Sequence, residues 1–153
     1  MNPLEFLAVV LPSAGHGLYC TAELTKKKEH LFVEDLEDFY PNVTNWVEQE
    51  CDVFFALATF DDAKNRKAEN ARFIKSLFID MDGYATKKQA AYALKAFLSE
   101  TGLDLLGTPW IVGSGGGLHC YWPFEEETEH QQGRSTMDHP PMPQQGVLPC
   151  RLQ

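Results

Sequence analysis

Residues 77–82 read Leu77-Phe78-Ile79-Asp80-Met81-Asp82, an apolar run that ends in two aspartates separated by one residue. Alternate side chains of a β-strand point to the same face, so Asp80 and Asp82 project together and the apolar residues line the opposite, buried face. Neighbouring carboxylates repel each other, and a cation between them relieves that repulsion. Hard cations such as Mg²⁺ prefer oxygen ligands and leave positions for substrate phosphates. The stretch therefore predicts a strand that carries a metal site. The alternative is a strand end that runs into a solvated acidic turn at Gly83.

A glycine turn with a histidine follows farther along the chain. The sequence is Trp110-Ile111-Val112-Gly113, then Ser114-Gly115-Gly116-Gly117, then Leu118-His119-Cys120-Tyr121-Trp122. Consecutive glycines let backbone N–H groups approach a ligand closely and can form an anion-binding nest. In a strand that starts at Leu118, His119 and Tyr121 share one face. We expect His119 to point toward a cleft beside the turn. The alternative is a plain glycine hairpin whose histidine is satisfied by a backbone carbonyl.

Taken together, residues from about 17 to 124 resemble the primase–polymerase domain of the archaeo-eukaryotic primase superfamily. The likeness is greatest to the replication proteins of phages and plasmids. The matching segments are Gly17-Leu18-Tyr19-Cys20 and residues 53–60, 66–70, 77–82 and 114–123. The resemblance implies an α/β (α+β) fold in which a mixed sheet carries helices on one face. It also implies an RRM-like catalytic core that is C-terminally incomplete in this chain.

The resemblance assigns roles to individual residues. In that family the D-x-D motif, here Asp80 and Asp82, binds catalytic Mg²⁺ or Mn²⁺. The small-x-His motif, here Gly117-Leu118-His119, contacts the phosphates of the incoming nucleotide, which makes His119 the third catalytic candidate. The candidate nucleotide-binding residues are Ser114, Gly115, Gly116, Gly117, His119, Arg66, Arg72 and Lys75. The implied activity is metal-dependent primer synthesis or extension in phage or plasmid DNA replication. Its partners are nucleoside triphosphates, single-stranded or primer–template DNA and a replicative helicase.

A third acidic motif on a later strand completes the metal site of the family, and this sequence has no convincing counterpart. Residues 125–153 contain five acidic residues, four prolines and few large apolar groups. Such a segment buries too little apolar surface to offset its ordering entropy. We therefore expect a partial domain over 1–124, a disordered tail over 125–153 and a reading frame that breaks near residue 130. The chain alone is expected to be inactive or weakly active, with Glu125, Glu126 and Asp138 as the remaining candidates for the third ligand.

Two alternative functions stay open. One is a degenerate, non-enzymatic remnant that binds nucleotide or nucleic acid. The other is a haloacid-dehalogenase-like phosphatase, whose first motif is also an apolar strand ending in D-x-D-G. In that scheme Asp80 is the nucleophile and Asp82 the general acid/base. Tyr84 stands where that family usually has Thr, and the glycine–histidine segment has no role there.

The charge distribution restricts where nucleic acid can bind. The net charge of −9 over 153 residues argues against a surface that binds nucleic acid throughout, because such binding depends on Lys and Arg contacts to phosphate. Basic residues nevertheless gather just before the D-x-D strand, at Lys64, Arg66, Lys67, Arg72 and Lys75. This strip suits a template or a triphosphate, although a solvated loop explains any single member equally well.

The cysteines and the N-terminus indicate a cellular compartment. The four cysteines, at 20, 51, 120 and 150, show no C-x-x-C spacing, which argues against structural zinc and fits reduced thiols. The apolar run from Phe6 to Leu11 is too short to span a membrane and lacks preceding basic residues. We expect a cytoplasmic protein of a bacterial cell with no membrane contact.

Hydrophobic spacing predicts the secondary structure. Helices are expected at 3–10, at 34–49 with a break at Pro41, at 68–74 and at 86–101, the last between an N-cap at Thr86 and Gly102. Strands are expected at 18–23, 30–33, 53–60, 75–82, 108–113 and 118–122.

Overall fold

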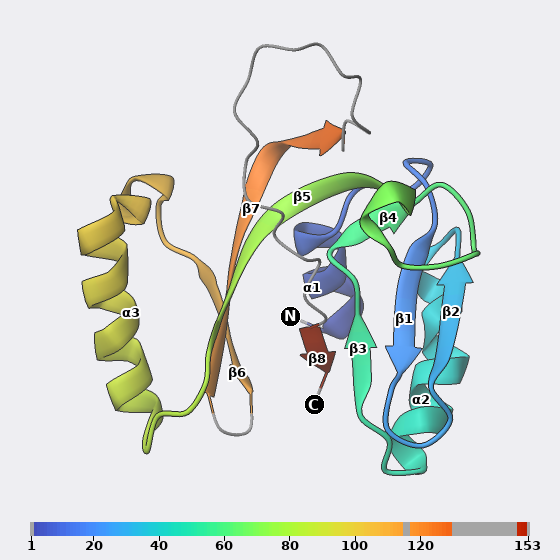
Figure 1. Cartoon of the computed structure of the whole chain (residues 1–153), viewed down its shortest axis with the longest axis horizontal. Coiled ribbons are helices and arrows are strands. Elements are labelled where there is room, and N and C mark those ends of the chain that lie inside the picture. Colours follow the sequence, from blue (N-terminus) through green and yellow to red (C-terminus); the bar gives the residue numbers. More distant parts are fainter. Residues whose placement is uncertain (1, 115–116, 130–149, 153) are drawn as a thin grey trace. The chain divides into compact units, whose positions relative to one another are not determined.

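The computed structural model describes residues 2–114, 117–129 and 150–152 (Figure 1). These residues form three α-helices, three short 3-10 helices and eight strands, which confirms the predicted α+β class. The chain divides into two compact units. The first comprises Met1–Lys75 with Glu126–Leu152, and the second comprises Ser76–Glu125.

The first unit contains a four-stranded sheet of order β2-β1-β3-β8, in which every pairing is antiparallel. Its strands are β1 (Tyr19–Glu23), β2 (Glu29–Val33), β3 (Val53–Phe55) and β8 (Cys150–Leu152). The unit also holds α1 (Pro3–Val10), which begins with a capping box between Asn2 and Glu5. The β1–β2 hairpin and α1 follow the sequence prediction.

Proline splits the helix predicted over 34–49, as expected. The 3-10 helix η1 (Leu36–Phe39) is followed directly by α2 (Tyr40–Glu48). Pro41 lies in the first turn of α2, where its missing N–H costs no helical hydrogen bond. Trp46 of α2 then packs with Cys51 and Val53.

A second sheet has the order β4-β5-β7-β6. Its strands are β4 (Ala58–Phe60), β5 (Ala71–Met81), β6 (Trp110–Ser114) and β7 (Gly117–Glu129). The β4–β5 and β6–β7 pairs are antiparallel. The long strands β5 and β7 each contribute residues to both units.

Three sequence expectations need correction. The predicted single mixed sheet is two four-stranded sheets, and all pairings of defined register are antiparallel. The strand predicted over 53–60 is interrupted at Ala56 and Leu57, because β3 pairs with β1 whereas β4 pairs with β5. The helix predicted over 68–74 is only the 3-10 turn η2 (Ala68–Asn70). The Asn70 amide there donates to the Asp62 and Asn65 carbonyls, and β5 starts at Ala71.

The C-terminal part contains more strand than composition indicated. β7 continues through Glu129, so the boundary predicted at residue 124 falls within a strand. Glu127 of β7 pairs with His16 and accepts the Ser13 N–H at 2.6 Å. Burial raises the pKa of the Glu127 carboxyl, but the Ser13 and His16 donors outweigh it and hold that pKa below its usual value. Residues 130–149 and 153, Asp138 among them, lie outside the described residues.

The second unit is built around α3 (Lys87–Thr101), the clearest helix of the sequence prediction. The Thr86 hydroxyl accepts the Gln89 N–H at 3.2 Å, and Gly102 ends the helix at a φ of 74°. The 3-10 helix η3 (Leu103–Leu106) follows. The buried face of α3 packs on residues of β5 and β7, in a core of Met81, Ala90, Leu94, Leu118, Cys120 and Trp122. One face of these strands is therefore taken by the helix.

Two further findings concern the helices and the cysteines. None of the helices within the described ranges is long and apolar enough to cross a lipid bilayer. Cys20, Cys51 and Cys120 are free, buried thiols. Burial raises the pKa of Cys20 to about 12 and that of Cys120 to about 11, so these thiols are poor nucleophiles at neutral pH.

The lysine run between β1 and β2 wraps a buried carboxylate. Glu23 accepts the backbone N–H groups of Thr25, Lys26, Lys27 and Lys28, at 2.5–3.2 Å, and the Thr25 hydroxyl. Burial raises the Glu23 pKa, but these donors prevail and lower it to about 2. The backbone N–H groups of Lys26–Lys28 thus stabilise the β1–β2 hairpin through their hydrogen bonds to Glu23.

We predict that Glu23 makes the protein sensitive to acid. Its folded pKa of about 2 lies below the ordinary value of 4.5, so its contribution to stability is present above pH 4.5 and is lost as the pH falls toward 2. Glu23→Gln is expected to lower the melting temperature at pH 7 and to lower it much less at pH 2.5. Glu29→Gln, an exposed acid on the paired strand, serves as the control. An equal melting-temperature loss at both pH values would contradict the assignment.

Candidate functional site

Asp80 and His119 meet on the sheet face that α3 leaves uncovered in the second unit. His119 Nε2 on β7 lies 3.6 Å from Asp80 Oδ1 on β5. His119 is buried, and its ring stands edge-on to Phe78 at 5.5 Å between centroids. Its neighbours Leu118 and Cys120 join the core under α3. The predicted alternation in both strands is therefore confirmed, and it brings the D-x-D and glycine–histidine motifs together.

The electrostatics of this face favour a cation. Burial raises the pKa of the Asp80 carboxyl, His119 opposes this effect, and the Asp82 carboxylate raises the pKa again, so that it lies above its usual value. The Asp80 side chain is 40% exposed, which leaves it accessible from solvent. A carboxylate in these surroundings gains from any bound positive charge.

Gly117 brings the two motifs into direct contact. A Cβ at this position would overlap the Asp82 Oδ1 atom and the Met81 carbonyl oxygen. Only glycine therefore lets the start of β7 lie against the end of β5. The sequence assigned Gly117 to phosphate contact, and the structure adds a packing reason for the glycine.

Ser114 lies on the same face as His119. It pairs with Gly117 across the β6–β7 ladder, and residues paired in an antiparallel ladder share a face. Ser114 is 8% exposed, and its hydroxyl has no hydrogen-bond partner within the described ranges. A buried donor without a partner costs free energy, and a ligand oxygen would satisfy it. Gly115 and Gly116 lie outside the described residues.

Phe78 and Tyr121 complete this face around the histidine. Their rings lie 5.0 Å apart between centroids, and the Tyr121 ring is 6.5 Å from that of His119. The sequence placed Tyr121 beside His119 but gave Phe78 no role. Its position two residues before Asp80 on a strand was the signal for a shared face.

The aspartate pair fits a hard divalent cation with an incomplete protein shell. Asp80 and Asp82 supply carboxylate oxygens at the end of β5, and Mg²⁺ binds such pairs while it keeps waters and substrate phosphates as further ligands. In the part of the chain that the structure describes, no group of three or more His, Cys, Asp or Glu side chains is arranged to hold a metal ion. Asp80 and Asp82 therefore provide two carboxylate ligands, and water and substrate oxygens would complete the coordination of the cation.

The basic residues predicted to bind nucleotide belong to the first unit. Arg72 Nε lies 3.5 Å from Asp61 Oδ1, and Lys75 Nζ donates to the Ala8 carbonyl at 3.4 Å. Arg66 has a buried Nε with no hydrogen-bond partner in the described ranges. Arg66 thus keeps an uncommitted donor, whereas Arg72 and Lys75 have partners within their own unit.

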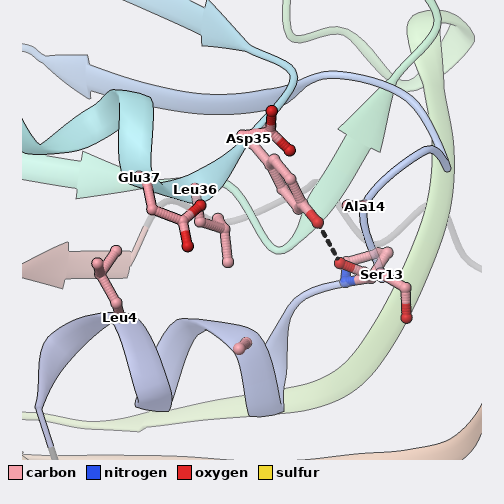
Figure 2. Close-up of a pocket in the computed structure, with 9 residues that line it drawn as sticks. Leu4, Ser13, Ala14, Asp35, Leu36 and Glu37 are labelled. Atoms are coloured by element: carbon pink, nitrogen blue, oxygen red, sulfur yellow. Dashed lines mark hydrogen bonds between the residues drawn. The ribbon is translucent and has the colours of Figure 1, made fainter.

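Two pockets of the first unit have acidic side chains in their linings. The first, of about 320 Å³, is lined by residues of α1 and η1 and by the segments next to them, with Leu4, Leu36, Asp35 and Glu37 among them (Figure 2). Tyr19 also lines it, and its hydroxyl donates to the Pro12 carbonyl at 2.7 Å. A second pocket is lined by Gly15, Gly17, Leu18, Glu34, Asp35, Asp61 and Arg72. Neither contains Asp80, Asp82 or His119, and in both linings acidic side chains outnumber basic ones, which disfavours a phosphate.

Comparisons with protein-family models, with curated proteins and with solved structures found no match. The functional assignment therefore rests on the residues of the second unit and on the resemblance of their motifs.

We predict that Gly117→Ala destabilises the protein by about 1–3 kcal/mol, since the new methyl group meets the backbone of Met81, which cannot rotate away. Gly113→Ala is the matched control, because a Cβ there meets only the mobile end of Lys87. Thermal or urea unfolding of both variants checks the prediction. A Gly117→Ala protein as stable as the wild type would show that β7 does not lie on β5 as described.

Proposed function

We propose that this chain carries the metal- and nucleotide-binding face of a primase–polymerase-type nucleotidyltransferase that acts in DNA replication. The observation that carries the proposal is the pairing of His119 with Asp80 at 3.6 Å, on the same sheet face as Gly117 and Ser114. Two motifs that are far apart in the sequence thus supply carboxylates for a cation and donors for a phosphate at one place. This combination suits a metal-bound nucleoside triphosphate.

Each residue has a chemical task in this scheme. Asp80 and Asp82 hold Mg²⁺ or Mn²⁺, which when bound neutralises phosphate charge and activates a primer 3′-hydroxyl. His119 donates a ring N–H to a phosphate oxygen, an electrostatic role that stabilises charge as the α-phosphate is attacked. The Ser114 hydroxyl is a second donor on this face. Gly117 lets the end of β5, with its two aspartates, lie against the start of β7.

The partners follow from this chemistry. The substrates are nucleoside triphosphates on single-stranded or primer–template DNA, and a replicative helicase is the proposed accessory protein. The third acidic ligand of the family is not among the described neighbours of Asp80 and Asp82, so we propose weak catalysis by this chain. A two-carboxylate site also favours the non-catalytic alternative, in which the same face binds a metal–nucleotide complex without turnover.

The phosphatase alternative receives less support. It uses Asp80 as a nucleophile and leaves the glycine–histidine segment without a task.

We predict that Asp80→Asn/Asp82→Asn abolishes tight Mn²⁺ binding in calorimetric titrations, because the two carboxylates are the cation's protein ligands. Glu37→Gln/Asp38→Asn removes the same charge from exposed residues of η1 and is expected to bind Mn²⁺ like the wild type. Indistinguishable Mn²⁺ affinities in the wild type and the Asp80/Asp82 variant would rule out the proposed cation site.

We predict that replacing His119 with a residue of similar size lowers nucleotide affinity and leaves the protein folded. His119→Phe keeps a ring against Phe78 and removes the donor. Its affinity for dATP in the presence of Mn²⁺ is expected to fall by about 1.5–3 kcal/mol, the range for a hydrogen bond to a charged group. Titration calorimetry measures the change, and circular dichroism checks the fold. Retained dATP affinity in a folded His119→Phe protein would assign His119 a structural role only.

A further inference from the structure

Lys87, the first residue of α3, lies against the strand that leads into the glycine turn. Its Nζ atom is 2.8 Å from the point where a Cβ at Gly113 would sit. Gly113 therefore makes room for the ammonium group, immediately before Ser114. The Lys87 side chain has no ion pair or hydrogen bond among the described residues. The exposed ammonium group of Lys87, which no acidic side chain pairs among the described residues, thus lies beside β6.

The short connection between β5 and α3 places Lys87 at the end of the sheet that carries Asp80 and Asp82. Residues 82–86 connect the end of β5 to the start of α3, so α3 begins at the D-x-D end of β5 (Figure 1). Ser114, the last residue of β6, and Gly117, the first of β7, reach the same end, because Gly117 contacts Met81 and Asp82. Lys87, Ser114 and Asp82 therefore surround one end of the sheet.

The two donors approach that end from opposite faces. Gly113 pairs with Leu118, which faces α3, so Lys87 reaches β6 from the helix side. Ser114 points to the aspartate side, and its buried hydroxyl has no partner in the part of the chain that the structure describes. The first N–H groups of α3 add partial positive charge next to Lys87. A polyphosphate that lies across the end of the sheet meets both donors.

We propose that Lys87 is a further nucleotide-binding residue, which binds the terminal phosphates of the triphosphate. This inference rests on the proposed function and extends it. A triphosphate carries more negative charge than one divalent cation neutralises, and Lys87 supplies the additional positive charge beside Ser114. Lys88 does not share this role, since its Nζ lies over the Tyr92 ring at 5.8 Å from the centroid.

The test compares dATP, dAMP and deoxyadenosine in calorimetric titrations of the full chain with Mn²⁺. Lys87→Met is expected to weaken dATP binding about tenfold and to change dAMP binding about twofold or less, since one charge-assisted contact to the outer phosphates is lost. Gly113→Ala displaces the ammonium without changing the net charge and is expected to weaken dATP binding by a smaller factor. Lys88→Met, which removes the same charge from the adjacent residue, is expected to bind dATP like the wild type.

Three outcomes would overturn the assignment. Equal losses in Lys87→Met and Lys88→Met would show a general charge effect. Unchanged dATP affinity in Lys87→Met, alongside lost binding in Asp80→Asn/Asp82→Asn, would remove Lys87 and leave the proposed function standing. Absence of dATP binding by the wild type would overturn the proposed function and this inference together. Lys87 is exposed, so the Lys87→Met protein is expected to fold, and its melting temperature checks this.

Discussion

The start of β7 lies directly on the end of β5, and this contact exists because Gly117 has no side chain. The strand register that follows sets every other feature of the face. It directs His119 toward Asp80, while the separate β6–β7 ladder pairs Ser114 with Gly117. A slip of one residue would turn His119 into the core under α3 and expose Leu118. The glycine thus determines which side chains can act together.

The two faces of these strands have different physical roles. The face under α3 is an apolar core that holds the helix in place. The other face carries a buried histidine, a serine hydroxyl with no partner among the described residues, and a carboxyl group whose pKa is raised. Buried polar groups that lack partners lower stability. Under the proposed function, a bound ligand would give the Ser114 hydroxyl the partner that the described residues do not supply.

Local patterns in the sequence predicted the parts of the fold that depend on local rules. The period of two in residues 77–82 and 118–122 assigned the faces correctly, and the Thr86 cap and Gly102 fixed the ends of α3. Alternation does not say which strand lies next to which, so the interruption at Ala56 and the two-sheet arrangement were missed. Glu127 and Lys87 were missed for a similar reason. Glu127 contacts His16, and Lys87 lies beside Gly113, only because the folded chain brings these distant residues together.

The proposed function requires a cation site at Asp80 and Asp82, beside Gly117 and His119. Paramagnetic broadening of backbone amide signals by Mn²⁺ locates such a site residue by residue in the isotope-labelled protein. Signals of residues 80–82 and 117–119 are expected to broaden first, at concentrations that leave the acidic pocket residues Glu34, Asp35 and Asp61 unaffected. Broadening that begins at those pocket residues, or that is uniform along the chain, would contradict the proposed cation site.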